Sequence, residues 1–141
     1  MLTTRKSGII LHPTSLPGPY GIGDLGPSAC AFVDMLHQAG QTVWQMLPPG
    51  HISYGNSPYM CISAFAGNPW LISPDLLLRD GFLNDSDLAD TPVFPDDHVE
   101  YSEVLPFKIH ILQKAYGRFL KSGGVFLQAY SDFCAEQAYW L

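Results

Sequence analysis

The residues with the greatest potential for binding chemistry lie in one stretch, residues 54–69, which reads Y-G-N-S-P-Y-M-C-I-S-A-F-A-G-N-P. It combines aromatic rings, amides and hydroxyls with glycine and proline, and it contains no charged side chain. Such a segment is either an ordered loop that packs against its own protein or a loop that binds a neutral, hydroxyl-rich ligand through ring faces and polar edges. The residue types alone favour the packing interpretation.

The charge of the chain argues against several classes of partner. Its 141 residues carry a net charge of −6 at pH 7, whereas nucleic acids and anionic membranes call for a basic patch, so we expect neither as a partner. No Lys or Arg occurs between Lys6 and Arg79, and the only acids before Asp75 are Asp24 and Asp34. This region could hold a phosphate only through backbone N–H groups.

The cysteines and the apolar runs indicate a compartment. The chain has three widely spaced cysteines, Cys30, Cys61 and Cys134, and no C-x-x-C pair. Their odd number and spacing predict buried free thiols in a reducing environment, and the sequence contains no metal-binding signature. The N-terminal apolar run is too short for a signal peptide, and no run approaches the ~20 residues of a membrane span. We therefore expect a cytoplasmic protein.

The elements that must position the stretch are two predicted strands and a helix. Residues 8–12 predict a buried strand and residues 42–47 a second strand. Between them, Pro27 fits the first position of a helix that ends at Gly40 and presents one apolar face, formed by Phe32, Val33, Leu36 and Ala39. Strand, helix and strand in this order predict an α/β protein with a parallel βαβ unit.

This unit changes the balance between the two interpretations of residues 54–69. Residues 12–19 and 51–59 follow the two strands, so both segments lie at the carboxyl edge of the sheet, where parallel α/β proteins place their functional loops. Binding and packing are then equally supported. Three residues, His12, Trp44 and Trp70, are better explained as structural residues, although a ligand contact by His12 remains an alternative.

The second half of the chain is predicted to be mostly helical. Ser73 and Pro74 suit a helix start, Gly81 ends that helix, and the acidic residues 82–102 read as a surface loop. Residues 106–121 predict a helix with an apolar stripe. Residues 125–141 predict another helix that reaches Leu141 without a stop signal, which indicates a sequence cut short.

A G-x-G-x-x-G motif at residues 21–26 suggests a dinucleotide site, but its surroundings argue against one. Eight residues separate it from the preceding strand, Pro27 removes a backbone donor, and no acid closes the second strand to hold a ribose. A tight, irregular loop explains these glycines better than a nucleotide.

Three blocks together resemble the 4-α-glucanotransferases, the amylomaltase or disproportionating-enzyme family. They are G-I-I-L-H-P-T-S-L-P-G-P-Y-G-I-G-D-L-G at residues 8–26, W-Q-M-L-P at residues 44–48, and Y-G-N-S-P-Y with S-A-F-A-G-N-P within residues 54–69. The resemblance covers residues 7 to about 101.

This resemblance implies a (β/α)₈ TIM barrel, incomplete here, with residues 1–53 as its first βαβ unit and residues 54–141 as an inserted, mostly helical substrate-binding subdomain. It implies transfer of α-1,4-glucan segments between maltooligosaccharides, with retention through a covalent glycosyl-enzyme and no diffusible cofactor. The family's catalytic carboxylates are expected beyond Leu141, so we name none here and expect the chain alone to be inactive. A non-catalytic glucan-binding remnant is the alternative.

The same resemblance implies the residues that contact sugar. Tyr59 is implied as the ring that stacks beside the scissile bond, with Ser57, Asn56 and the backbone at Gly55 as polar contacts. Asn56 stands where the family often has Asp. The resemblance further implies two aromatic residues that hold a glucan farther out, namely Tyr54 and Tyr101.

Overall fold

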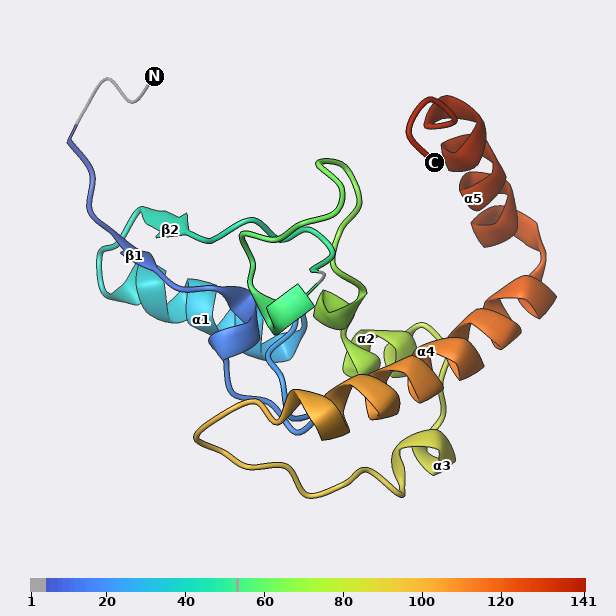
Figure 1. Ribbon diagram of the computed structural model, residues 1–141, viewed down its shortest axis with the longest axis horizontal. Coiled ribbons are helices and arrows are strands. Elements are labelled where there is room, and N and C mark those ends of the chain that lie inside the picture. The colour runs from blue at the N-terminus through green and yellow to red at the C-terminus, as the bar shows by residue number, and fades with distance from the viewer. Residues whose placement is uncertain (1–4, 53) are drawn as a thin grey trace.

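A parallel pair of short strands joined by a helix forms one side of the molecule in this computed structural model, which describes residues 5–52 and 54–141 (Figure 1). Strand β1 (Gly8–Ile10) pairs with β2 (Val43–Gln45) in parallel, and α1 (Pro27–Gln38) connects them. Pro27 occupies the first turn of α1, as its missing N–H allows. The predicted βαβ unit is therefore confirmed.

Contacts between α1, β1 and β2 fix this unit. The indole N–H of Trp44 donates to the carbonyl of Leu11 at 2.8 Å, and its ring meets Phe32 of α1 edge to face at a centroid distance of 5.0 Å. Trp44 is thus a structural residue, as expected. The same packing brings the segments that follow β1 and β2 to one edge of the sheet.

The prediction that the first strand is buried is wrong. The side chains of Ile9 and Ile10 are 43% and 60% exposed. In the described part of the chain the sheet has two strands, so β1 has a neighbour on one side only. Apolar β-branched residues indicate a strand that can be buried, but burial needs a covering layer that these residues do not themselves supply.

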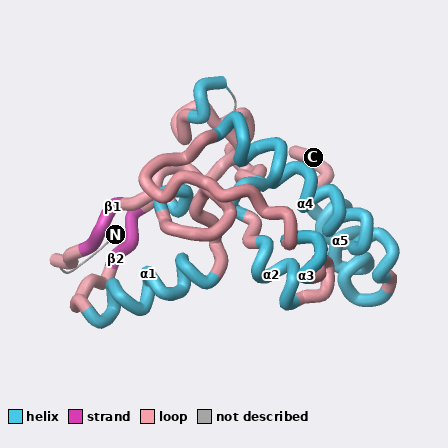
Figure 2. Tube along the Cα trace, turned by 90° about the horizontal axis from the view of Figure 1, so that it is seen from below, coloured by secondary structure: helices cyan, strands magenta, loops and turns pink. Residues whose placement is uncertain are grey.

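The second half of the chain is helical, with α2 (Pro74–Arg79), α3 (Asp85–Leu88), α4 (Tyr101–Ser122) and α5 (Gly124–Glu136). Figure 2 shows these helices on one side and β1, β2 and α1 on the other, with loops between the two groups. Three 3₁₀ turns lie in the loops, at Pro13–Ser15, Tyr54–Asn56 and Pro69–Leu71.

Three predicted boundaries in this half are wrong. The acidic segment contains α3, which begins with a reciprocal capping box between Asn84 and Asp87. Helix α4 begins at Tyr101 and contains Pro106 in its interior, because the carboxylate of Glu100 accepts the backbone N–H of Ser102 at 3.2 Å and caps the helix earlier. Helix α5 ends at Glu136 and does not continue to Leu141.

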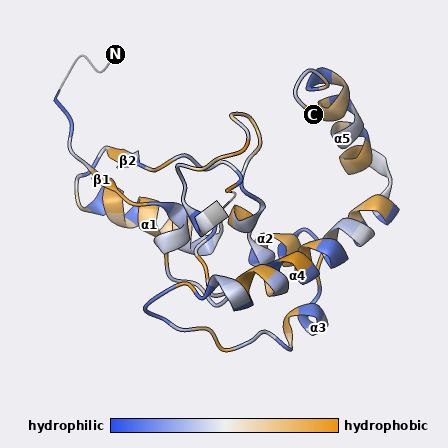
Figure 3. Cartoon of the chain, in the orientation of Figure 1, coloured by the Kyte–Doolittle hydropathy of each residue, from blue (hydrophilic) through white to orange (hydrophobic). Residues whose placement is uncertain are grey.

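The core lies where α4 crosses the loops that follow β1 and β2. Ile22, Trp70 and Val104 form its buried cluster, and Ile52, Phe94 and Tyr101 are among the partly buried residues packed against it. Hydrophobic residues recur along α1, α4 and α5 in Figure 3. Four buried side chains mark the inner face of α4, namely Val104, Lys108, Ile111 and Ala115. Lys108 is the one charged side chain among these four.

The cysteines differ from the prediction in their burial. All three cysteines are free, as expected, but Cys30 is exposed and Cys61 and Cys134 are only half-buried, so the prediction of buried thiols is wrong. None of the helices in residues 5–52 and 54–141 has the length and apolarity needed to cross a membrane.

Candidate functional site

The charge-poor loop, residues 54–69, is closed at its base by backbone pairing. Antiparallel bridges join Gly50 to Gly67 and Ile52 to Cys61. The N–H of Asn68 donates to the carbonyl of Pro49 at 2.8 Å, and the Asn68 side chain accepts the N–H of Trp70 at 3.0 Å. The loop therefore leaves and rejoins the core at defined points, which is the property a binding loop needs.

The start of the loop has an unusual backbone. Gly55 has φ of 74° and Asn56 has φ of 53°, so two successive residues adopt the left-handed conformation. Glycine reaches this region without strain, and asparagine is among the side chains that tolerate it best. A Cβ on Gly55 would meet no atom within 4 Å, so the backbone here is open to an approaching molecule.

Tyr59 projects from the loop and is 73% exposed. Its own N–H donates to the Ser57 hydroxyl at 3.4 Å, and the Ser57 carbonyl accepts the N–H of Met60 at 3.0 Å. Ser57 and Asn56 are half-buried. The structure thus brings four of the predicted site residues together in one short segment, with an exposed ring beside polar groups and no charge.

The other two predicted aromatics are placed differently. Tyr101 is half-buried at the first turn of α4, and its side chain packs against the core cluster. Burial raises the pKa of its hydroxyl. The side chain of Tyr54 lies outside the described residues. Tyr101 and Ile52, which lies near the base of the loop, pack against the same core cluster, and the role of Tyr101 as a glucan contact stays a prediction.

The charge-poor loop also contacts the end of the chain, which no sequence pattern predicts. Phe65 stacks on Trp140 and meets Tyr139 edge to face, both with ring centroids 5.7 Å apart. A cavity of about 210 Å³ lies beside Phe65, lined by residues 48–50, 61 and 63–67. The aromatic surface of the loop at Phe65 therefore includes rings from the end of the chain, through a contact between residues 75 positions apart that no local pattern signals.

The two histidines near the carboxyl edge act in the structure of the loops. The Nδ1 atom of His12 is 2.7 Å from the hydroxyl of Thr14, and burial lowers the pKa of the ring, an effect that the backbone of Pro48 opposes. The ring of His51 lies 6.4 Å from that of Trp70. Trp70 belongs to the core, as expected, and the contacts of His12 favour the structural interpretation.

Two carboxylates, those of Asp24 and Asp75, have partners within the fold. Asp24 is buried, with Oδ2 3.5 Å from Nζ of Lys108, which is fully buried and also donates to the carbonyl of Ile72 at 2.8 Å. Burial raises the pKa of Asp24 and lowers that of Lys108, and the attraction between the two charges opposes both shifts. Asp75 accepts the hydroxyl of Tyr20 at 2.6 Å. No predicted role covered Lys108, because a lone lysine in a helix reads as a solvated residue.

The glycine motif at residues 21–26 forms part of a folded loop. The N–H of Gly23 donates to the carbonyl of Thr14 at 3.1 Å, so the motif folds back on the loop before it, as a tight irregular loop does. Within the described residues, no group of three or more His, Cys, Asp or Glu side chains could hold a metal ion.

Known proteins match this chain over nearly its whole length. The family model described as 4-alpha-glucanotransferase matches residues 11–141. The chain is 47% identical to the 4-alpha-glucanotransferase of Synechocystis sp. over 142 residues, covering 100% of this chain and 28% of that protein. It is 42% identical to that of Thermus thermophilus, covering 97% of this chain and 27% of that protein.

A solved structure agrees with the family match. The amylomaltase from Streptococcus agalactiae in complex with acarbose superposes with a TM-score of 0.87 at 40% identity, over 96% of this chain and 28% of that chain. The parallel strands and helices therefore match part of an amylomaltase structure. The chain spans about 28% of the length of these relatives. With the family model matched over residues 11–141, the chain belongs to the 4-alpha-glucanotransferase family.

Proposed function

We propose that the protein transfers segments of α-1,4-glucan between maltooligosaccharides, with retention through a covalent glycosyl-enzyme, and that this chain supplies sugar contacts while other residues supply the catalytic carboxylates. The observation that carries the proposal is the exposed ring of Tyr59 on a charge-poor loop that is closed at its base. An aromatic face and uncharged polar groups suit a sugar, which offers C–H surfaces and hydroxyls but no charge.

The chemistry of transfer fits a loop of this kind. A transferase must keep water from acting as the acceptor and must hold sugar on both sides of the bond that breaks. Apolar rings exclude water, and the Ser57 and Asn56 side chains lie close enough in sequence to Tyr59 to meet hydroxyls of the same sugar. The structure of a relative with acarbose supports this class of ligand.

Two carboxylates of this chain already have partners within the fold. A retaining glycosidase mechanism needs two carboxyl groups only ~5 Å apart. Asp24 is paired with Lys108, Asp75 accepts the hydroxyl of Tyr20, and residues 35–74 contain no acid. We therefore propose that the nucleophile and the acid lie outside this chain, on a (β/α)₈ barrel whose first unit is residues 1–53 and whose inserted subdomain starts at residue 54.

The test is transfer by the complete protein that the gene encodes, with Tyr59→Ala and Tyr59→Phe as variants. Incubation with maltotriose should yield glucose and longer maltooligosaccharides, which chromatography resolves. Loss of a stacking ring should lower kcat/KM up to about tenfold in Tyr59→Ala, whereas Tyr59→Phe keeps the ring and most of the rate. Tyr116→Ala is the matched control, because it removes an exposed tyrosine from α4.

Two outcomes would contradict parts of the proposal. Equal rates for Tyr59→Ala and Tyr116→Ala would show that Tyr59 is not the stacking ring. A complete protein that retains binding to maltooligosaccharides but releases no glucose from maltotriose would favour the alternative, a glucan-binding protein without catalysis.

A further inference from the structure

Helix α5 is anchored at its start to the helices that precede it. A turn at residues 123–124, where both glycines have positive φ, separates it from α4 (Figure 1). Two edge-to-face ring contacts follow. Phe126 of α5 meets Phe82, which follows α2, at a centroid distance of 5.3 Å. Tyr130 of α5 meets Phe119 of α4 at 5.6 Å. These contacts fix the direction in which α5 leaves the helical half of the molecule.

The other end of α5 lies against the charge-poor loop. After Glu136 the chain turns back, and the backbone N–H of Trp140 donates to the carbonyl of Gln137 at 3.0 Å. The indole N–H of Trp140 donates to the side-chain oxygen of Gln137 at 2.7 Å. Phe133 of α5 meets the indole edge to face at 6.2 Å. The orientation of the indole is therefore set within its own segment, and in that orientation it stacks on Phe65 at an interplanar angle of 25°.

Phe65 lies on a side of the charge-poor loop that is open to solvent. The two antiparallel bridges close the base of the loop, whereas Ile62 and Phe65 are 66% and 60% exposed. The cavity of about 210 Å³ lies beside Phe65, so part of the space next to this ring is unfilled. The contacts of Phe65 with Tyr139 and Trp140 therefore hold the loop at a second point, away from its base.

We propose that α5 braces the charge-poor loop and that Trp140 is a positioning residue, which keeps the loop ordered for its ligand through the ring of Phe65. This inference rests on the proposed function for the ligand, and it gives a role to residues outside the predicted sugar contacts. Because α5 is anchored at its start and its distal end meets Phe65, it restricts the loop before any ligand is present. A loop that is already ordered loses less conformational entropy when a ligand binds.

Removing the ring of Trp140 should loosen the free loop and leave the ligand-bound loop unchanged. Binding must then order the loop, so the affinity falls while the reaction of the bound complex keeps its rate. In the complete protein, Trp140→Ala should raise KM for maltotriose about 2–10-fold, which is the effect of one aromatic pair, with kcat close to the wild-type value. Trp140→Phe keeps a ring at this position and should restore most of the affinity.

Hydrogen exchange of the backbone amides, followed by mass spectrometry, measures the order of the loop in the complete protein without reference to activity. The N–H groups of Phe65 and Ala66 donate to the Ser63 hydroxyl at 3.1 and 3.0 Å, so their exchange depends on the loop keeping its conformation. These groups should exchange faster in Trp140→Ala than in the wild type. Saturating maltotriose should remove most of this difference.

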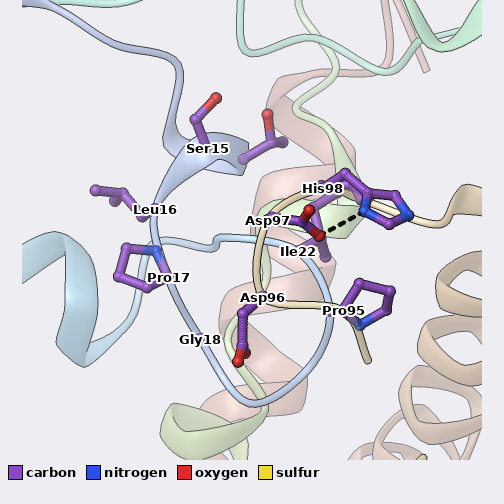
Figure 4. A pocket seen from close by; sticks show the side chains of 12 residues that line it. Ser15, Leu16, Pro17, Gly18, Ile22, Pro95, Asp96, Asp97 and His98 are labelled. Atoms are coloured by element: carbon purple, nitrogen blue, oxygen red, sulfur yellow. Dashed lines mark hydrogen bonds and ion pairs between the residues drawn. The ribbon is translucent and has the colours of Figure 1, made fainter. Parts of the chain in front are cut away.

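A larger cavity provides an internal reference for this measurement. It has a volume of about 480 Å³ and is lined by residues 14–18, 21 and 22, which follow β1, and by residues 95–99, which precede α4 (Figure 4). None of these residues belongs to the charge-poor loop or to α5, so their exchange should be the same in every variant. Leu141→Ala is the matched control, because Leu141 is exposed, follows Trp140 directly and has no ring to stack on Phe65.

Three outcomes would overturn the inference. The first is equal exchange of residues 60–66 in Trp140→Ala, Leu141→Ala and the wild type. The second is faster exchange that extends to the residues around the larger cavity, because Trp140 would then stabilise the whole fold rather than the loop. The third is faster exchange of the loop with an unchanged KM, or a fall in kcat that Trp140→Phe does not restore.

The proposed function can fail independently. A wild-type protein that releases no glucose from maltotriose would remove the enzyme proposal and the kinetic measurement with it. Exchange of the loop in the free protein would still test the brace, since faster exchange confined to residues 60–66 in Trp140→Ala supports it and unchanged exchange contradicts it.

Discussion

Replacing Lys108 with methionine should destabilise the protein strongly, because it leaves the carboxylate of Asp24 buried without an opposite charge. Lys108 has no exposed surface, and its Nζ atom lies 3.5 Å from Oδ2 of Asp24 and 2.8 Å from the carbonyl of Ile72. Methionine keeps most of the volume and removes the charge. The substitution therefore tests electrostatics rather than packing.

The loss of unfolding free energy in each variant depends on which charged or polar groups the variant leaves buried without a partner. Removing one partner of a buried ion pair costs about 3–5 kcal/mol, whereas replacing both with neutral groups of similar volume is close to neutral in many proteins. Lys108→Met with Asp24→Asn still loses the bond to the Ile72 carbonyl, which costs about 1–3 kcal/mol. The double variant should therefore be more stable than Lys108→Met alone, by about 2 kcal/mol.

The pH dependence has a definite sign. Burial already holds the pKa of Asp24 above its ordinary 3.8, and loss of Lys108 removes the attraction that opposes this shift. A carboxyl whose pKa is higher in the folded state than in the unfolded state stabilises the fold below the unfolded pKa and loses that stability as pH rises. The loss of unfolding free energy in Lys108→Met, relative to the wild type, should therefore be largest at neutral pH and shrink as pH falls toward 3.8.

The assay is urea unfolding of the complete protein at pH 7.5 and at pH 5, with Lys114→Met as the control. Lys114 is partly exposed and lies 3.5 Å from Asp87, so its loss should cost no more than about 1 kcal/mol. The reasoning is refuted if Lys108→Met and Lys114→Met unfold with the same free energy. It is also refuted if the deficit of Lys108→Met does not diminish at the lower pH.

Three further substitutions have definite expected outcomes. Gly21→Ala should destabilise by about 1–3 kcal/mol or more in thermal unfolding, because of its positive φ and the ring of Phe94; an unchanged melting temperature would contradict this. Asn84→Ala should cost about 1 kcal/mol through the lost capping box, whereas Asn84→Asp should restore most of it. The hydrogen bond from Arg118 holds the pKa of Asp87 at about 2, below its ordinary 3.8. This ion pair therefore stabilises the fold above pH 3.8, and its contribution is lost as pH falls through about 2. Arg118→Met should flatten the acid-unfolding profile in this pH range, and an unaltered profile would contradict the pairing.

Much of the fold could be predicted because local rules agree with it. Pro27 starts α1 and Pro74 starts α2 at the positions where a missing N–H is tolerated. The parallel pairing follows from the order of a strand, a helix and a strand along the chain. By contrast, the cap of α4 depends on the carboxylate of Glu100, which outweighs the preference of Pro106 for the first turn.

The predicted sugar contacts comprise a group of residues that are close in sequence and a residue, Tyr101, whose packing involves distant residues. Residues 55–59 are close in sequence, so any folded loop keeps Gly55, Asn56, Ser57 and Tyr59 together, and their roles as sugar contacts stay predictions. Tyr101 stays a predicted glucan contact, and the structure shows its half-buried side chain against the core cluster. That cluster combines Val104, which is close to Tyr101 in sequence, with Ile22 and Trp70, which are distant from it.

The sequence by itself determined the family, the βαβ order of the first half and the charge-poor loop, because these reside in contiguous residues. Only the tertiary structure decided that Lys108 is a buried partner of Asp24, that Phe65 meets Trp140, and that the loop after β1 encloses a cavity with residues 95–99. Each of these is a contact between segments far apart in the chain. Such contacts depend on how helices and loops pack to bury apolar surface, a balance of many small terms over the whole fold that no local pattern of residues records.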